Sequence, residues 1–359
     1  MTTTGISEGA PRDAGRSPAS LPFLLRAERP DELAAYLRAR GWLAVDEALL
    51  AVAPAGEGNM NCTLRLTTTR RTLVVKQGRP WVEKYPDIPA PDDRSLIEAA
   101  FYAQVRAVSG VADRMPALYG LDPESRVLLL EDCAGFSDLT DLHAKARLDD
   151  SLLVDLLEYL RALHALPVDE HSLVAFRNDA MRRLNHEYIF CLPLANQAAL
   201  HGRLETITPG LADAARFLSA DEPYVSRVHA LGDTYLHGET RVLVHGDFFP
   251  GSWLSDGTRV KVIDPEFCFA GAPEFDYGVM AAHLILGDQE PAIVRRIVAA
   301  AGDAGCDEGL VAAFAGVEIM RRLIGVAQLP RLDRTLREKA DLLRVSRNLV
   351  GGEMRLGGG

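Results

Sequence analysis

The sequence predicts an α+β protein of two lobes, in which a β-rich N-terminal lobe precedes a mainly helical C-terminal lobe. The first observation is a series of short apolar or β-branched segments between residues 49 and 76, separated by turn residues. The second is the helical spacing of apolar residues that begins near Ser151 and dominates the remaining chain, with one β-like interruption at 241–263. With 359 residues, the chain is long enough to bury a large core.

The N-terminal lobe is expected at residues 22–132 and begins with a helix over 32–40 that Asp31 can cap. Strands are expected at 49–52, 62–67, 72–76 and 126–130, and a helix at 94–108. Three prolines between residues 86 and 91 keep the chain before that helix extended. These elements make the first lobe β-rich.

The C-terminal lobe is expected at residues 133–350. Its clearest element is an amphipathic helix over 151–166, which carries leucines at positions 153, 156, 157, 160 and 163. Residues 1–21 are rich in Thr, Gly, Ser, Pro and charge and are predicted to be a disordered tail. Residues 351–359, which begin and end with glycines, are predicted to be a flexible tail.

Composition excludes several classes of partner. The net charge is −11 and the chain has no basic patch, so no nucleic-acid partner is expected. The chain has no run of roughly 18 apolar residues and no signal-peptide core, so no membrane partner is expected either. Five scattered cysteines argue against disulfides and zinc, which predicts a cytoplasmic protein. The oligomeric state stays open, a homodimer included.

A glycine-containing loop at residues 56–61 (Gly-Glu-Gly-Asn-Met-Asn), hereafter the Gly loop, lies between two expected strands. Glycine lets backbone N–H groups approach phosphates closely, so such a loop can cover a nucleotide. Taken alone, the pattern is more typical of a plain β-turn. The sequence contains no Gly-x4-Gly-Lys-Ser/Thr motif and therefore does not support a P-loop fold.

Lys76 ends an apolar strand beside the Gly loop, where a lysine can reach the α- and β-phosphates of a nucleotide. Such a lysine needs an anionic partner, and Glu98 in the following helix is the candidate. The alternative interpretation is a solvated lysine at a strand end. A third motif decides between the two.

That motif comprises residues 245–252 (His-Gly-Asp-Phe-Phe-Pro-Gly-Ser) and 262–266 (Val-Ile-Asp-Pro-Glu). Phosphoryl transfer to a hydroxyl requires a carboxylate near the acceptor proton and oxygen ligands for magnesium. Asp247 is the predicted catalytic carboxylate. Ser252 occupies the position at which kinases place a metal-ligand Asn, and Asp264 is the predicted Mg²⁺ ligand. Glu266 is predicted to contact the metal directly or through another ligand.

Arg321 and Arg322 stand next to each other in an expected helix. Adjacent helical residues point about 100° apart, so at most one of the two is expected to face a given site squarely. Arginine can grip a phosphate or a sugar oxygen with its planar fork of donors. A solvated helix face is the alternative interpretation of this pair.

Together these residues resemble the aminoglycoside and choline kinase superfamily and, within it, the 5-methylthioribose kinases. The resemblance extends from about Gly56 to Leu329. It rests on residues 58–61 (Gly-Asn-Met-Asn), 75–77 (Val-Lys-Gln), 251–252 (Gly-Ser), 264–267 (Asp-Pro-Glu-Phe) and 321–325, where two arginines precede a glycine.

The resemblance implies a protein-kinase-like fold with ATP and Mg²⁺ as cofactors and a small-molecule hydroxyl compound as substrate. By the same resemblance, Gly58, Asn59 and Asn61 help to bind the nucleotide. The backbone between Glu131 and Cys133 is implied to clasp the adenine, and Arg321 or Arg322 to lie near a sugar substrate. Members of this family phosphorylate the anomeric hydroxyl of a 5-thio-substituted ribose during methionine salvage.

Three departures from the family pattern concern the substrate. Phe248 and Phe249 replace the family's Leu-His, Pro250 replaces a Thr, and Ile88 stands where a Trp is usual, while a Trp occurs earlier at position 81. A related pentose, a nucleoside, an aminoglycoside or another natural product therefore remain alternative acceptors.

Two further classes of protein are less well supported by the sequence. A non-catalytic nucleotide-binding module typically lacks one of the residues corresponding to Lys76, Asp247 and Asp264, and all three are present here. A hydrolase that uses His245 and a serine is disfavoured because the chain has no G-x-S-x-G elbow.

Overall fold

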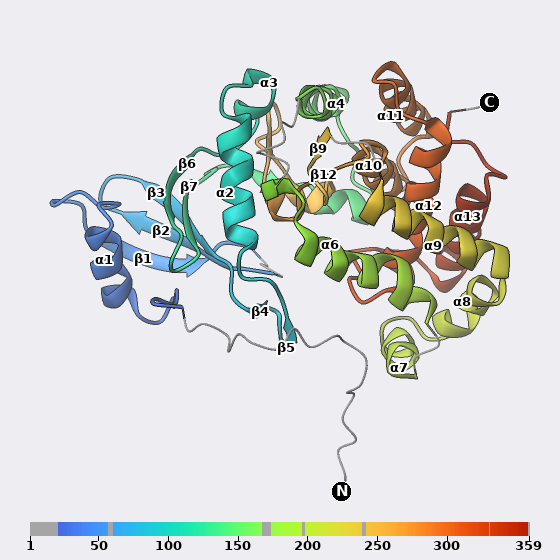
Figure 1. The fold of residues 1–359 in the computed structure, drawn as a ribbon, viewed down its shortest axis with the longest axis horizontal. Helices are drawn as coiled ribbons and strands as arrows, with labels where there is room; N and C mark the ends of the chain where they lie inside the picture. Colours follow the sequence, from blue (N-terminus) through green and yellow to red (C-terminus); the bar gives the residue numbers. More distant parts are fainter. Residues whose placement is uncertain are drawn as a thin grey trace, which may run out of the picture.

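The computed structural model describes residues 21–56, 60–166, 174–195, 198–238, 242–329 and 331–357. Figure 1 shows a β-rich N-terminal lobe beside a larger, mainly helical C-terminal lobe. The predicted α+β, two-lobed fold is confirmed. The boundaries expected for the lobes and tails stay predictions, although α13 (Leu336–Gly351) includes the first residue of the expected C-terminal tail.

The N-terminal lobe contains an antiparallel sheet with the strand order β1-β2-β3-β7-β6. Its strands are β1 (Leu49–Pro54), β2 (Cys62–Thr68), β3 (Thr72–Gln77), β6 (Leu118–Asp122) and β7 (Val127–Glu131). In β2 buried residues alternate with more exposed ones, so one face of the sheet forms a small core with α1 (Pro30–Ala39). Asp31 was expected to cap this helix, but Pro30 already occupies its first turn, which suits the fixed φ of proline. Asp31 therefore lies inside the helix.

Helix α2 (Arg94–Val105) lies between this sheet and the C-terminal lobe (Figure 1). Its residues Phe101, Tyr102 and Val105 belong to the same buried cluster as the helices of the C-terminal lobe. The short helix α3 (Ser109–Ala112) follows. Helix α2 therefore connects the packing of the two lobes.

The proline-containing segment before α2 forms a hairpin of β4 (Trp81–Val82) and β5 (Tyr85–Pro89), hereafter the β4–β5 hairpin. It extends from the N-terminal lobe toward α7 (Ala198–Ile207) in the C-terminal lobe (Figure 1). Arg203 of α7 donates a hydrogen bond to the Tyr85 hydroxyl at 3.1 Å, and its guanidinium lies 5.5 Å from the centre of the Tyr85 ring. The hairpin thus contacts both lobes.

The C-terminal lobe combines helices with short strands and turns. Its longer helices are α4 (Asp150–His164), α6 (Asp179–His186), α7, α8 (Leu211–Ala220), α9 (Glu222–His237), α10 (Glu274–Leu286), α11 (Pro291–Asp303), α12 (Glu308–Ile324) and α13. Its short helical segments are the 3₁₀ helices η1 (Thr140–Ala144), η3 (Leu192–Leu194), η4 (Pro250–Ser252) and η5 (Pro265–Phe267) and the π-helix η2 (Glu187–Cys191). Its strands are β8 (Ser137–Asp138), β9 (Val242–Val244), β10 (Trp253–Ser255), β11 (Val260–Val262) and β12 (Phe269–Gly271), which pair as β11-β10-β8 and β12-β9.

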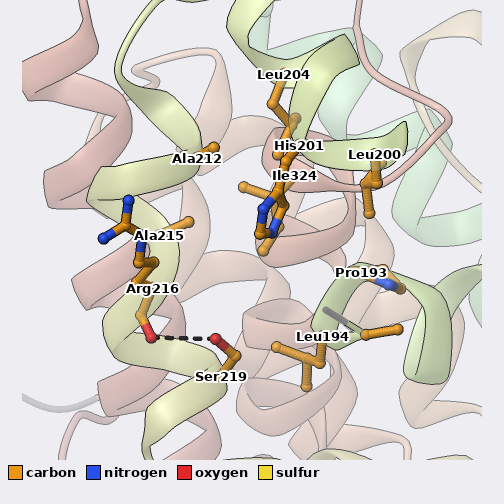
Figure 2. Close-up of a pocket in the computed structure, with 11 residues that line it drawn as sticks. Pro193, Leu194, Leu200, His201, Leu204, Ala212, Ala215, Arg216, Ser219 and Ile324 are labelled. Carbon is orange, nitrogen blue, oxygen red and sulfur yellow. Dashed lines mark hydrogen bonds between the residues drawn. The ribbon is translucent and has the colours of Figure 1, made fainter. Parts of the chain in front are cut away.

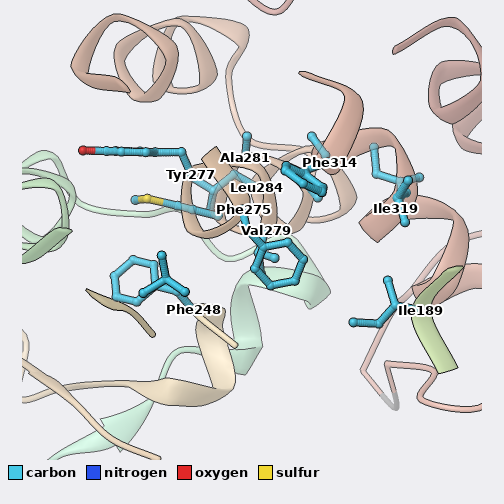
Figure 3. Close-up of a cluster of buried hydrophobic side chains, with 14 of the residues drawn as sticks. Ile189, Phe248, Phe275, Tyr277, Val279, Ala281, Leu284, Phe314 and Ile319 are labelled. Carbon is cyan, nitrogen blue, oxygen red and sulfur yellow. The ribbon is translucent and has the colours of Figure 1, made fainter. Parts of the chain in front are cut away.

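The main core is centred on α10 and α12. Figure 3 shows Phe275 of α10 and Phe314 of α12 among the buried side chains, and their rings meet edge to face at 5.4 Å. The two helices approach closely at Gly278, where an added Cβ would lie 2.7 Å from the Phe314 Cβ. On its other side, α12 meets α13 at Gly316, where an added Cβ would lie 2.8 Å from the Ser346 carbonyl oxygen. Helix α12 is therefore held between two neighbours with little freedom to shift.

In the ranges that the structure describes, no helix is both long and apolar enough to cross a membrane. All five cysteines lie in those ranges, and each carries a free thiol.

Candidate active site

The loop that carries Asp247 follows β9 and is anchored through its backbone. The N–H groups of His245 and Gly246 donate to the carboxylate of Asp276 in α10, at 2.7 and 2.9 Å. The Nε2 atom of His164 lies 3.0 Å from the same carboxylate. Gly246 has a φ of +84°, and an added Cβ would lie 2.2 Å from the Phe267 carbonyl oxygen, so only glycine fits here. These contacts fix the backbone that presents Asp247.

The side chain of Asp247 is 22% exposed and faces two guanidinium groups. The Nη2 atoms of Arg321 and Arg322 lie 3.4 and 3.2 Å from its Oδ1 atom. Burial raises the pKa of Asp247, although both arginines act in the opposite direction. The carboxylate is therefore a stronger base than an ordinary solvated aspartate.

The expectation that at most one of Arg321 and Arg322 faces the site is wrong. Both reach Asp247 because Glu318, one helical turn earlier, accepts hydrogen bonds from the Nε atoms of both. The two side chains are only 11% and 8% exposed, which also excludes a solvated helix face. Long, flexible side chains can converge on one carboxylate even when their Cα–Cβ bonds diverge.

The two phenylalanines after Asp247 have different surroundings. Phe248 is fully buried and stacks on Tyr159 of α4 at 5.6 Å between ring centres. Phe249 packs against Arg322, whose guanidinium lies 4.7 Å from the centre of its ring. Phe248 therefore belongs to the core, whereas Phe249 supports one of the two arginines.

Lys76 of β3 lies at the contact between the lobes. Its Nζ atom is 2.7 Å from Glu98 Oε2 in α2 and 2.8 Å from Asp264 Oδ1. Burial alone would lower the pKa of Lys76, but Asp264 and Glu98 outweigh it and raise that pKa. The structure thus brings together the lysine and the carboxylate that the sequence paired. Their contact with a nucleotide stays a prediction.

Asp264 itself has the left-handed backbone conformation, with φ of +62°. This conformation is uncommon for a residue other than glycine and clusters at functional sites. Half of the Asp264 side chain is exposed, so the carboxylate that contacts Lys76 is also open to solvent.

The carboxylate of Glu266 connects the C-terminal lobe to the Gly loop. Its Oε2 atom accepts a hydrogen bond from Asn61 Nδ2 at 2.6 Å and lies 3.3 Å from Arg94 Nε. The fully buried Arg94 also donates to the Asn61 side chain and to backbone carbonyls of Met60 and Arg79. Glu266 and Asn61 therefore bind each other across the lobes. The predicted Gly58 and Asn59 lie outside the described residues.

Ser252, in η4, is buried, and its hydroxyl donates to the backbone carbonyl of Asp247 at 3.0 Å. Its own carbonyl accepts from the N–H of Ile263 at 3.0 Å, next to Asp264. Ser252 thus ties the Asp247 loop to the Asp264 segment. Its oxygen keeps an acceptor lone pair, so metal ligation by Ser252 stays a prediction.

The predicted adenine-binding segment runs from Glu131, at the end of β7, to Cys133. The Glu131 side chain accepts from the Ala117 N–H at 2.9 Å. Burial raises the pKa of the Cys133 thiol to about 11, so this thiol is neutral at ordinary pH. The segment joins the two lobes, but its contact with adenine stays a prediction.

A magnesium ion bound to nucleotide phosphates needs only one or two protein carboxylates. The half-exposed carboxylate of Asp264 and the Oε1 atom of Glu266 are oxygen ligands of the kind that such an ion prefers. Nowhere in the described residues do three or more His, Cys, Asp or Glu side chains form a metal-holding group. The donor set therefore fits a metal that arrives with the nucleotide better than one held by the protein alone.

Several residues at this site were missed by sequence reasoning. Four buried residues are Arg94, Asp276, His283 and Glu318. Arg94 binds Asn61, and Asp276 binds the backbone next to Asp247. Glu318 binds both arginines, and His283 binds Glu318. In the sequence, Glu318 and Arg322 have the spacing of an ordinary helical ion pair, which is the signal that could have identified Glu318. The sequence contains no comparable signal for Arg94, because its partners come from distant segments.

A separate pocket lies between α7, α8, η3 and the end of α12 (Figure 2). It is lined by Leu200, His201, Leu204, Arg216 and Ile324, among others, and its volume is about 30 Å³. This volume is far below that of a typical small-molecule site. The predicted site residues do not line it.

The model of the phosphotransferase enzyme family matches residues 51–313. A methylthioribose kinase from Escherichia coli O45:K1 is 27% identical over 246 residues, which cover 66% of this chain and 57% of that protein. A methylthioribose kinase from Bacillus velezensis is 25% identical over 345 residues, which cover 84% of each chain.

Two solved structures resemble the fold. A spectinomycin phosphotransferase in complex with ADP and spectinomycin has a TM-score of 0.52 at 11% identity and covers 89% of this chain and 96% of its own. The choline kinase LicA from Streptococcus pneumoniae has a TM-score of 0.50 at 12% identity. The match covers 90% of this chain and 99% of the LicA chain. At these identities the likeness shows the fold alone.

Proposed function

This chain belongs to the phosphotransferase enzyme family, and on that premise we propose that it is an ATP-dependent kinase of a pentose-type sugar. The proposed acceptor is 5-methylthioribose or a close analogue, as in the relatives named above. The resemblance to this superfamily is confirmed, as is the predicted class of small-molecule phosphotransferase at the level of the family. The acceptor, the use of Mg²⁺ and a cytoplasmic location are parts of the proposal.

One observation carries the proposal. A partly buried Asp247, next to two arginines, and an Asp264 bound to Lys76 project from adjacent segments at the junction of the lobes. Asp247 would accept the proton of the acceptor hydroxyl as its oxygen bonds to the γ-phosphorus. The bond between that phosphorus and the β–γ bridging oxygen of ATP breaks in the same transfer, and this oxygen leaves as part of the β-phosphate of ADP. Positioning and charge neutralisation supply most of the rate in such a reaction.

The protein's own residues would divide this work. Lys76, held by Glu98, would contact the α- and β-phosphates, and Asp264, with Glu266, would hold the metal. When bound, Mg²⁺ neutralises charge on the phosphates. Because Lys76 contacts Asp264, a nucleotide that binds at this position would have to loosen this ion pair.

The charges around Asp247 favour an uncharged acceptor. Two guanidinium groups within 3.4 Å of its carboxylate would repel a cationic aminoglycoside or choline at the same position. A sugar hydroxyl, by contrast, can accept hydrogen bonds from the arginines and donate to Asp247. The surroundings of Asp247 therefore support a polyol over a polycation.

The test is a coupled assay of ADP release with Mg-ATP. Candidate acceptors are 5-methylthioribose, ribose, 5-deoxyribose, nucleosides, choline and aminoglycosides, each assayed in parallel. Saturable, magnesium-dependent turnover of 5-methylthioribose is expected, with little or none for the cationic compounds. Turnover confined to an aminoglycoside or choline would overturn the proposed acceptor, and the absence of turnover with every compound would overturn the kinase itself.

A further inference from the structure

Glu318 lies in the middle of a buried polar network behind the candidate catalytic carboxylate. It belongs to α12, is 1% exposed, and accepts hydrogen bonds from Arg321, Arg322 and His283. Burial alone would raise the pKa of Glu318, but Arg321 and Arg322 hold it well below its usual range. The residue is therefore an anion at ordinary pH.

The atoms used by Glu318 determine which atoms the arginines present to the cleft. One carboxylate oxygen accepts from Arg321 Nε, and the other accepts from Arg322 Nε at 2.8 Å. The terminal Nη2 atoms of both arginines are left on the side of Asp247, 3.4 and 3.2 Å from its Oδ1. A single carboxylate thus orients two adjacent guanidinium groups toward the same point.

The position of Glu318 is itself fixed from behind. His283 Nε2, from α10, lies 2.9 Å from Glu318 Oε1, and His283 Nδ1 lies 2.8 Å from His143 Nε2 of η1. Burial lowers the pKa of His283 to about 4 and that of His143 to about 2, so both rings are neutral at ordinary pH. With a proton on each Nε2, His143 donates to His283 and His283 donates to Glu318. The network joins η1, α10 and α12.

This network balances charge in addition to filling the core. Two buried guanidinium groups side by side repel each other, and Asp247 alone would have to neutralise both. With Glu318 present, two positive charges face two negative charges. Asp247 then shares the arginines instead of being bound tightly by them, which keeps its second oxygen available for a hydroxyl proton.

We propose that Glu318, held by His283 and His143, is the positioning residue that aims Arg321 and Arg322 at the acceptor beside Asp247. This inference rests on the proposed function for its kinetic consequence, but the arrangement of the arginines can be measured without any substrate. Glu318 touches no reacting atom. Its effect is exerted through the arginines.

The first experiment measures solvent exchange of the arginine Nε–H protons by NMR of protein labelled with ¹⁵N-arginine. Arg321→Lys and Arg322→Lys identify the two resonances. Both protons are expected to be protected in the wild type, and Glu318→Gln is expected to accelerate their exchange by roughly 10-fold or more, since a charged hydrogen bond is lost. The control is Glu308→Gln, an exposed glutamate of the same helix, which is expected to leave both unchanged.

The second experiment separates acceptor binding from nucleotide binding in the same variants. Glu318→Gln is expected to raise the KM for the acceptor roughly 10- to 100-fold. The affinity for ADP, measured by calorimetry, is expected to stay that of the wild type. A merely structural role would lower both affinities together or neither.

If Glu318→Gln does not fold, two variants at His283 test the same positioning role. The His283→Leu variant removes the donor to Glu318, whereas His283→Gln retains an N–H near the Nε2 position. The leucine variant is expected to lose protection of the arginine protons and to raise the acceptor KM, and the glutamine variant is expected to restore both.

The outcomes separate the inference from the proposed function. Unprotected arginine protons in the wild type, or protection that survives both Glu318→Gln and His283→Leu, would overturn the inference whatever the activity. An equal loss of affinity for the acceptor and for ADP would also overturn the inference. A wild-type protein that turns over no acceptor would overturn the proposed function, and the exchange data would still decide whether Glu318 positions the arginines.

Discussion

At the scale of single residues, Asp247 combines a fixed backbone with a side chain shared between two cations. The carboxylate of Asp276 accepts hydrogen bonds from the two backbone N–H groups that precede Asp247. The Ser252 hydroxyl donates to the Asp247 carbonyl. The carboxylate can therefore change protonation without moving the loop. This arrangement suits a group that accepts a proton in each catalytic cycle.

Replacing Asp247 by Asn is expected to lower turnover roughly 100- to 10,000-fold, because the amide keeps the shape but cannot accept the proton. Nucleotide affinity is expected to persist, since Lys76 and Asp264 are untouched. Turnover would be followed by ADP release and affinity by calorimetry. Asp213→Asn, on the exposed surface of α8, is the control, and unchanged turnover in Asp247→Asn would contradict the role of Asp247.

The pH dependence of kcat/KM provides a second prediction for this residue. Burial raises the Asp247 pKa above the ordinary value of 3.8, and only the ionised form can accept a proton. Activity is therefore expected to fall as the pH falls through an apparent pKa above 3.8. Assays at constant ionic strength would show this acidic limb. A profile that stays flat down to that ordinary value would argue against Asp247 as the base.

Residue-scale prediction from sequence succeeded where the partners lie in recognisable local patterns. Lys76 ends a strand and Glu98 lies in the next helix, so their meeting could be anticipated. Arg94 could not be identified in this way, and the spacing of Glu318 and Arg322 suggests an ion pair but not its place behind Asp247. The importance of Arg94 comes from its burial and from Glu266, which lies far away along the chain. The buried Glu318 is further fixed by His283 of another helix.

At the scale of elements, α12 carries Glu318 and both arginines, so its position decides where their side chains point. Glycines allow α12 to approach α10 at Gly278 and α13 at Gly316. Such close contacts transmit a small displacement of one helix directly to the next, because the core is close-packed.

Gly316→Ala is expected to destabilise the protein by about 1–3 kcal/mol, since the new Cβ would meet the Ser346 carbonyl and Val350 at 2.8 Å. This loss exceeds the gain of about 1 kcal/mol that alanine brings to an exposed helical site. Urea unfolding would measure it. The matched control is Gly202→Ala in α7, where an added Cβ has no described atom within 4 Å and a small gain is expected. Equal stability of the two variants would contradict this view of the α12–α13 contact.

Element prediction was most accurate for long periodic segments and least accurate at their ends. The helix expected at 94–108 ends at Val105, and the one expected at 151–166 runs from Asp150 to His164. The extended segment between Pro80 and Pro91 was anticipated, but not its pairing. The β4–β5 hairpin is short and depends on contacts with Arg94 and Arg203, so local pattern alone does not define it.

At the scale of the whole molecule, several contacts join the lobes around the candidate site. Among them are Lys76 with Asp264, Asn61 with Glu266, and Tyr85 with Arg203. The first two lie next to the predicted nucleotide position, and the third lies at the hairpin. The sequence predicted the two lobes and their order. The contacts between them depend on how the lobes pack, which no local pattern encodes.

Arg203→Ala is expected to loosen the β4–β5 hairpin, because it removes both the hydrogen bond to Tyr85 and the contact with its ring. Hydrogen exchange measured by mass spectrometry should show faster exchange over residues 81–89, with little change in the N-terminal sheet. The corresponding change at an exposed arginine of α8, Arg216→Ala, should leave the hairpin unaffected. Identical exchange in both variants would show that Arg203 does not hold the hairpin.

The ion pair between Lys76 and Asp264 also has a thermodynamic consequence. Lys76 and Asp264 bind each other across the lobes, in addition to the pair of Lys76 with Glu98. A nucleotide and its metal must therefore compete with an internal ligand, and the measured affinity is the difference between two binding processes. Salt weakens interactions of a half-exposed carboxylate. Salt consequently weakens both the internal ion pair and the binding of the nucleotide. The affinity for the nucleotide should therefore depend less on salt concentration than the charges of the ligand alone would suggest.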